Sequence, residues 1–140
     1  MRNKMESRGE IARSKHLSGY NCCQAVVCTY CDVLGIDEET AFKLAEGFGV
    51  GMGSGKGICG AVSGAVMVAG MKNSEGTSNK KTKGATMKLA SSIVNKFEQM
   101  NGTAICNELK GKDTGNVIRT CPDCVQDAIK IVEEIVMNDK

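Results

Sequence analysis

Residues 47–64 read Gly-Phe-Gly-Val-Gly-Met-Gly-Ser-Gly-Lys-Gly-Ile-Cys-Gly-Ala-Val-Ser-Gly. Glycine fills every second position at the start of this stretch and returns at Gly60 and Gly64. Because glycine lacks a Cβ, such a run costs backbone entropy on folding, but it permits positive φ angles and a very close approach of main chains. We therefore expect an irregular loop that leads into a buried helix beginning near Cys59.

The residues around and after Cys59 have the apolar spacing of a buried helix, the central helix of the chain. In the first turn of a helix, unpaired N–H groups and the positive end of the dipole favour the thiolate form of a cysteine. Gly60 and Gly64 give this helix a face of small residues, which would suit an internal helix contact or a homodimer. Burial without a chemical role is the other interpretation of Cys59, since free cysteines are commonly core residues.

Nucleotide binding is not expected from the glycine-rich stretch. Lys56 is followed by Gly57, whereas a phosphate-binding loop of the Walker type has Ser or Thr there. Residues 55–60 fit Gly-x-Gly-x-x-Gly, but no β-strand pattern precedes them, as a dinucleotide-binding unit requires. The basic residues are not interleaved with aromatic ones, so a nucleic-acid partner is not expected either.

The composition favours an all-α protein. The chain has 140 residues, one Pro, no Trp and only five Phe and Tyr residues in total, so its core must consist of aliphatic, Met and Cys side chains. We predict a single domain over residues 1–140, a compact bundle of about five to six helices with the glycine-rich loop before the central helix. Helices are expected at about residues 2–18, 22–34, 38–46, 58–71, 80–100 and from 121 onward.

Several residues are predicted to cap these helices. Asn21 and Asp37 are good N-cap residues for the second and third helices. Thr103 would cap a short helical turn that carries Cys106. Pro122 suits the first position of the last helix, which makes Cys121 the expected N-cap.

The N-terminal residues have no apolar core, and no apolar stretch reaches the ~20 residues that span a bilayer. We therefore expect a cytoplasmic protein without membrane insertion. In that compartment eight cysteines favour metal binding or redox chemistry over structural disulfides.

Three cysteines fall at predicted helix starts, namely Cys22, Cys59 and Cys121, and Cys106 lies in the short turn before the last helix. Helix starts directed at one centre would stabilise several thiolates or an anionic cluster of thiolates and metal. We predict that these four sulfur atoms share one pocket.

Cys121-Pro-Asp-Cys124 has the Cys-x-x-Cys spacing of thiol–disulfide oxidoreductases, although the βαβ context of thioredoxin is missing. Cys28 and Cys31 have the same spacing within an apolar helix, where packing is favoured over metal chelation. A zinc ribbon would require these two pairs to meet in space. His16, the only histidine, is expected to face solvent.

Four segments of the chain resemble a small family of suggested redox activity that shares four cysteines and a Cys-Gly-Ala-x-x-Gly motif. Residues 19–26 read Gly-Tyr-Asn-Cys-Cys-Gln-Ala-Val, and the glycine-rich loop continues into Cys-Gly-Ala-Val-Ser-Gly at 59–64. Cys106-Asn-Glu-Leu and Cys121 are similar to the third and fourth cysteine segments. The similarity covers nearly the whole chain.

The resemblance implies a helical domain related to one fused in the split-Soret cytochromes, where an iron–sulfur site is expected. It assigns the shared-cysteine role to Cys22, Cys59, Cys106 and Cys121. Cys124 stands where the family would have an aliphatic residue. The remaining cysteines are additions of this chain: Cys23, Cys28 and Cys31.

The first functional expectation is therefore an iron–sulfur centre held by the four shared cysteines, for electron transfer or redox sensing with a redox partner that the sequence does not identify. A thiol–disulfide oxidoreductase is the alternative, with Cys59, Cys121 and Cys124 as candidate catalytic thiols. A zinc-binding structural domain is the third.

Overall fold

The computed structural model describes residues 7–137, and all helices and turns below lie in that range. Regular structure there is helical, apart from one isolated antiparallel bridge between Ile58 and Ile105. The elements in order are α1 (Arg8–Leu17), α2 (Cys22–Thr29), α3 (Cys31–Leu34), α4 (Glu38–Ala45), η2 (Glu46–Phe48), α5 (Gly49–Met52), α6 (Gly60–Asn73), η3 (Lys80–Thr82), α7 (Lys83–Asn101), α8 (Cys106–Lys110), α9 (Cys121–Ile131) and η4 (Val132–Val136).

The all-α class predicted from composition is confirmed. Within the described residues, six α-helices have eight or more residues, and the others are single turns. The first predicted helix begins at Arg8, and the part of that prediction before Ser7 lies outside the described residues. The second predicted helix is broken at Tyr30, which has φ −110° and ψ 12° and separates α2 from α3.

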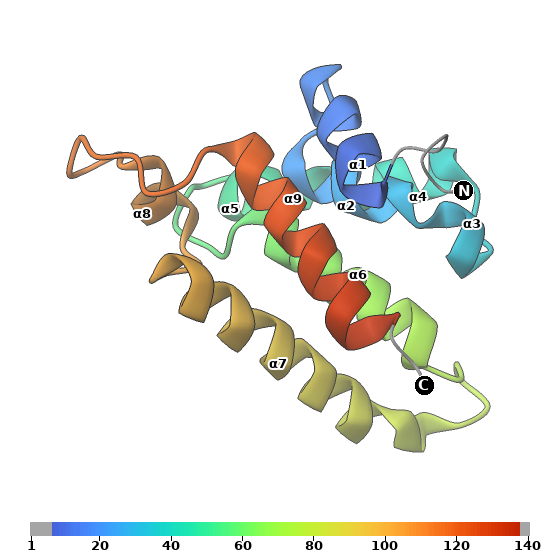
Figure 1. Cartoon of the computed structure of the whole chain (residues 1–140). Helices are drawn as coiled ribbons and strands as arrows, with labels where there is room; N and C mark the ends of the chain where they lie inside the picture. Colours follow the sequence, from blue (N-terminus) through green and yellow to red (C-terminus); the bar gives the residue numbers. More distant parts are fainter. Residues whose placement is uncertain (1–6, 138–140) are drawn as a thin grey trace.

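Helices α6 and α9 form the centre of the molecule. They lie side by side and begin at the same end, near α5 and α8 (Figure 1). Helices α1 and α2 pack against them on one side, and α7 packs against α6 and α9 along another. The core between these helices is aliphatic, with Tyr30 and Phe97 as its largest fully buried side chains.

The glycines at the start of α6 permit its contact with α2. A Cβ on Gly64 would lie 2.9 Å from Val26 Cβ and 3.0 Å from the Cys23 carbonyl oxygen. At Gly60 it would lie 3.2 Å from the backbone nitrogen of Cys23. The small-residue face thus serves an internal helix contact, and α2 occupies the surface that a homodimer through this face would need.

Two of the predicted caps and one predicted helix start differ by one or two residues in the structure. Thr120, not Cys121, is the N-cap of α9, and its hydroxyl accepts a hydrogen bond from the Asp123 N–H. Ile105 precedes α8 instead of Thr103, whose hydroxyl accepts from the Ile105 N–H at 3.1 Å. Cys59 lies one position before α6, as its N-cap.

The predicted caps at Asn21 and Asp37 are confirmed. Asn21 forms a reciprocal capping box with Gln24, and the Asp37 carboxylate accepts from the Thr40 N–H at 2.9 Å. Among residues 7–137, no helix combines the length and apolarity needed to cross a membrane.

Candidate thiol and metal site

Five cysteines from four different segments line one small cavity of about 90 Å³. They include all four cysteines predicted to converge, and Cys124 is the fifth. His16 also lines this cavity. Cys23, Cys28 and Cys31 are not among its lining residues, so the two Cys-x-x-Cys pairs do not meet there. The five that line it are Cys22, Cys59, Cys106, Cys121 and Cys124.

Backbone pairing brings Cys59 and Cys106 together. The Cys59 N–H donates to the Ala104 carbonyl at 2.7 Å, and the Cys106 N–H donates to the Gly57 carbonyl at 3.0 Å. These bonds flank the antiparallel bridge between Ile58 and Ile105. The end of the glycine-rich loop and the start of α8 therefore form one short ribbon that fixes both thiols at the cavity.

Gly51 shows why this loop needs glycine. Its φ is +57°, and an added Cβ would lie 2.6 Å from Cys106 Cβ and 2.8 Å from the Gly57 carbonyl oxygen. Its neighbours Val50 and Met52 also have positive φ, 55° and 63°, although neither is glycine. Left-handed backbone is unusual for a β-branched residue such as Val50, which lines the cavity. Strain of this kind is frequently concentrated at functional sites.

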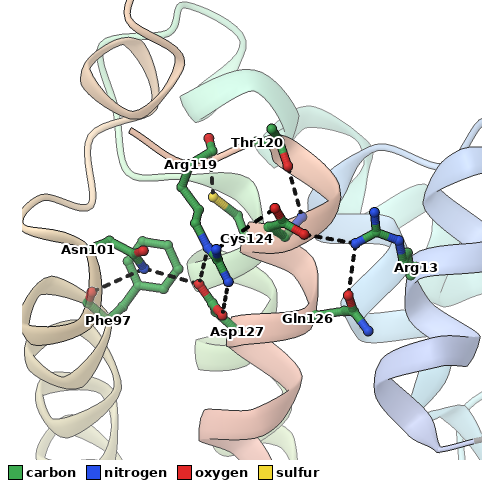
Figure 2. Close-up of polar contacts among 9 residues, drawn as sticks. Arg13, Phe97, Asn101, Arg119, Thr120, Cys124, Gln126 and Asp127 are labelled. Carbon is green, nitrogen blue, oxygen red and sulfur yellow. Dashed lines mark hydrogen bonds and ion pairs between the residues drawn. The ribbon is translucent and has the colours of Figure 1, made fainter. Parts of the chain in front are cut away.

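The first turn of α9 is held by a polar network that Figure 2 shows around Asp127. The Arg119 guanidinium donates two hydrogen bonds of 2.9 Å to the buried Asp127 carboxylate, which also accepts from the Asn101 side chain at 3.2 Å. The Cys124 thiol lies 4.0 Å from the Arg119 carbonyl. The network thus joins α9 to α7 and fixes the loop before Cys121.

A second set of contacts joins α9 to α1. The Arg13 guanidinium donates to the Asp123 carboxylate at 2.9 Å and to the Gln126 side-chain carbonyl at 2.8 Å (Figure 2). Since His16 lies one turn further along α1, these contacts also fix the distance between His16 and the start of α9.

His16 is where the prediction from sequence was wrong. It is half-buried, and one of its ring nitrogens lies within 4.8 Å of the sulfur atoms of Cys22 and Cys121, which are equally close to each other. His16 Nδ1 lies 2.9 Å from the Tyr20 carbonyl, which can only accept, so Nδ1 carries the proton. In the neutral ring the lone pair is then on Nε2, as in histidines that bind metals through that atom.

Cys59 is the most acidic of these thiols. Hydrogen bonds from the Cys124 and Cys22 thiols lower the pKa of Cys59 to about 3, against the opposing effect of burial. No side chain caps α6, but the backbone N–H groups of Ala61 and Val62 add to the lowering. The same thiol–thiol hydrogen bond raises the pKa of Cys124 above its ordinary range.

Cys121 is a second thiolate. A hydrogen bond from Cys22 lowers the pKa of Cys121 to about 6 against the opposing effect of burial, and the charge of Lys110 acts in the same direction as the hydrogen bond. Cys22 donates, so its own pKa is raised. Burial raises the pKa of Cys106. The cavity thus favours the thiolate form at Cys59 and Cys121 and the thiol form at Cys22, Cys106 and Cys124.

The family comparison bears on this arrangement of cysteines. A family model described as "Putative redox-active protein (C_GCAxxG_C_C)" matches residues 20–135. The chain belongs to this family. The family's description writes its central motif as Gly-Cys-Ala-x-x-Gly, whereas residues 59–64 of this chain read Cys-Gly-Ala-Val-Ser-Gly. The search of curated proteins and the search of solved structures found no match to the chain.

A group of thiolates, thiols and one imidazole in a largely apolar cavity is suited to two kinds of chemistry. Thiolate sulfur is a soft ligand for iron–sulfur clusters and zinc, and imidazole binds zinc as well. Thiolates next to thiols also exchange disulfides. The family's suggested redox activity is consistent with both.

Proposed function

We propose that the cavity binds an iron–sulfur centre through Cys22, Cys59, Cys106 and Cys121, and that the protein serves in electron transfer or redox sensing. The observation that carries this proposal is the convergence of five sulfur atoms from α2, the start of α6, α8 and α9 on one cavity. Isolated structural cysteines would instead lie separately among aliphatic side chains.

The donor set fits such a centre. Iron–sulfur clusters are held by cysteine thiolates, and Cys59 and Cys121 have lowered pKa values before any metal binds. Val50 and Leu109 supply apolar walls, and Lys110 offers positive charge. When bound, an iron–sulfur cluster supplies electron-transfer chemistry whose potential depends on hydrogen bonds to sulfur and on solvent exposure.

Cys124 has a different role in this proposal. It is 2% exposed and donates its S–H to Cys59. Such a donor to a ligand sulfur tunes the reduction potential of the centre rather than holding it. We expect Cys124→Ala to keep its iron and to shift the potential. Loss of iron in this variant would make Cys124 a ligand instead.

Anaerobic purification followed by iron, acid-labile sulfide and visible-absorbance measurements tests the proposal. We expect wild type to contain both elements and Cys106→Ser to lose most of them. Cys28→Ser is the matched control, because Cys28 is equally buried but does not line the cavity. A colourless, iron-free wild type, or equal loss in both variants, would contradict the proposal.

Thiol–disulfide exchange is a second candidate, favoured by one observation. Cys121 is the half-buried member of the cavity set, its pKa is lowered to about 6, and the Cys22 sulfur lies within 4.8 Å. Cys121 would attack a partner disulfide and Cys22 would resolve the mixed disulfide. A mixed disulfide trapped in Cys22→Ser but not in Cys121→Ser would support this function over the metal centre.

Zinc bound by His16, Cys22, Cys121 and a further cysteine is the structural alternative, since zinc accepts mixed nitrogen and sulfur ligands. The same metal analysis distinguishes it, because stoichiometric zinc without sulfide would favour this assignment. The iron–sulfur centre needs reduced cysteines, and we therefore propose a cytoplasmic location for the protein.

A further inference from the structure

Two cysteines outside the cavity form a pair of their own, at the other end of α2 from Cys22. Cys28 is buried at the end of α2, and Cys31 is half-buried at the start of α3. Thr29 and Tyr30 separate them in the sequence, at the junction of α2 and α3. Each thiol has only a weak contact to the backbone, Cys28 Sγ to the Glu38 carbonyl at 3.9 Å and Cys31 Sγ to the Val27 carbonyl at 4.0 Å.

The backbone between them allows a disulfide. Residues three apart on a helix have Cα atoms about 5 Å apart, which lies inside the range that disulfides span. The break at Tyr30 interrupts the helix between the two cysteines. The two thiols can therefore meet with a local change of side-chain rotamers.

We propose that Cys28 and Cys31 are a second redox site, a dithiol that closes to a disulfide by exchange with a small-molecule disulfide such as oxidised glutathione. The site is independent of the cavity and of any metal in it. Nothing in the proposed iron–sulfur function uses these two sulfur atoms.

The exchange runs in two balanced steps. The Cys31 thiolate attacks one sulfur of oxidised glutathione, an S–S bond breaks, and one glutathione thiolate leaves and takes up the proton released from Cys31. The Cys28 thiolate then attacks the Cys31 sulfur, the Cys28–Cys31 bond forms, and the second glutathione leaves in the same way. Overall, two cysteine thiols lose two electrons and two protons, and one glutathione disulfide becomes two thiols.

Exposure and charge decide which sulfur acts first. Cys31 is half-buried, whereas Cys28 is 5% exposed and reaches a reagent only through its partner. Lys15 near the pair favours a thiolate, but its ammonium is bound to the Glu38 carboxylate at 2.9 Å. Burial and Glu38 raise the pKa of both thiols. Since the reduced pair gains little from ionisation, the disulfide is the favoured form under mild oxidation.

Mapping by mass spectrometry tests this pair in the full-length protein. Reduced protein is incubated with oxidised glutathione, quenched with acid, alkylated and digested with chymotrypsin, which cleaves after Tyr20 and Tyr30. A Cys28–Cys31 disulfide joins the fragment that ends at Tyr30 to the one that begins at Cys31. Fragment spectra distinguish Cys28 from Cys22 and Cys23 as the partner.

We expect the joined fragments in wild type, their loss in Cys28→Ala, and their retention in Cys23→Ala. Cys23 is the matched control because it is buried on the same helix, with its thiol 3.6 Å from Met67 Sδ. Phenylarsine oxide, which bridges two adjacent thiols, is the second probe. It should protect Cys28 and Cys31 from alkylation together in native wild type. This second test uses no variant, so it does not depend on whether Cys28→Ala folds.

Two results would overturn the proposal. One is wild type in which Cys31 stays singly glutathionylated while Cys28 remains a free thiol. The other is a disulfide that joins Cys31 to a different cysteine. Neither result depends on whether the cavity binds metal, so the failure of this proposal is distinguishable from that of the iron–sulfur centre.

Discussion

Gly51→Ala tests whether the glycine-rich loop is shaped around Cys106. The new methyl group would meet two costs. A non-glycine residue at φ +57° costs about 1 kcal/mol, and a Cβ placed 2.6 Å from Cys106 Cβ forces overpacking, which typically costs about 1–3 kcal/mol. We therefore expect the free energy of unfolding to fall by about 2–4 kcal/mol.

Gly53→Ala is the matched control. Gly53 also has positive φ, +75°, but no atom lies within 4 Å of the position that a Cβ would occupy. It carries the conformational cost alone, so we expect a loss of about 1 kcal/mol. Urea unfolding of the reduced, metal-free proteins measures both values, and the difference of about 1–3 kcal/mol reports the contact with Cys106.

A metal assay on the same two variants adds a functional reading. If Cys106 is a ligand, Gly51→Ala should displace it and lower the iron content, whereas Gly53→Ala should keep it. Equal destabilisation of the two variants would refute the close approach of Gly51 to Cys106, and with it the steric requirement for glycine at that position.

Three further perturbations have defined outcomes. In metal-free native protein, the rate of Cys121 alkylation should decrease as the pH drops through about 6. In unfolded protein, the same decrease should occur near pH 9.0, the ordinary pKa of a thiol. A native midpoint near 9 would contradict the lowered pKa. Asp127→Asn should lower the free energy of unfolding by about 1–3 kcal/mol. The loss should be smaller than for a fully buried ion pair, because the Arg119 side chain is 39% exposed. An unchanged urea midpoint would show that this network contributes no stability. Burial is the main cause of the raised pKa of Cys31, and the Glu38 carboxylate is the second. Glu38→Gln removes this carboxylate, so labelling of Cys31 by iodoacetamide at neutral pH should become faster. A slower rate would contradict this electrostatic assignment.

Much of the fold follows from local sequence signals. Asn21 and Asp37 were predictable caps because their short polar side chains satisfy free N–H groups. The glycine-rich stretch indicated close contacts of the backbone, and Gly60 and Gly64 make them with α2. The choice between an internal contact and a dimer was not predictable, since the same small-residue face suits either.

Two predictions about the helices were wrong for different reasons, the N-cap of α9 and the unbroken second helix. Thr120 and Cys121 both precede Pro122, and the hydroxyl of Thr120 gains the capping role because it accepts the Asp123 N–H. No glycine or proline lies next to Tyr30, so the sequence carries no local signal that predicts the break of the helix there. The break follows from tertiary packing, since Tyr30 is fully buried and its hydroxyl donates to Glu133 at 2.7 Å.

The convergence of Cys22, Cys59 and Cys121 could be predicted because each falls at a helix start. His16 was missed because α1 carries few apolar residues, which suggested a solvent-facing helix. One signal was available: only Ser18 to Asn21 separate α1 from α2, and so tight a turn places the last turn of α1 beside Cys22. Cys124 also lines the cavity because it lies three residues after Cys121, on the same face of α9.

X-ray absorption at the iron edge of anaerobically purified wild type tests the metal centre most directly. We expect bound iron whose nearest neighbours are sulfur atoms, with a signal that Cys59→Ser abolishes and Cys23→Ser leaves unchanged. A preparation without iron, or iron surrounded by oxygen and unaffected by Cys59→Ser, would contradict the assignment of these converging cysteines to a metal site.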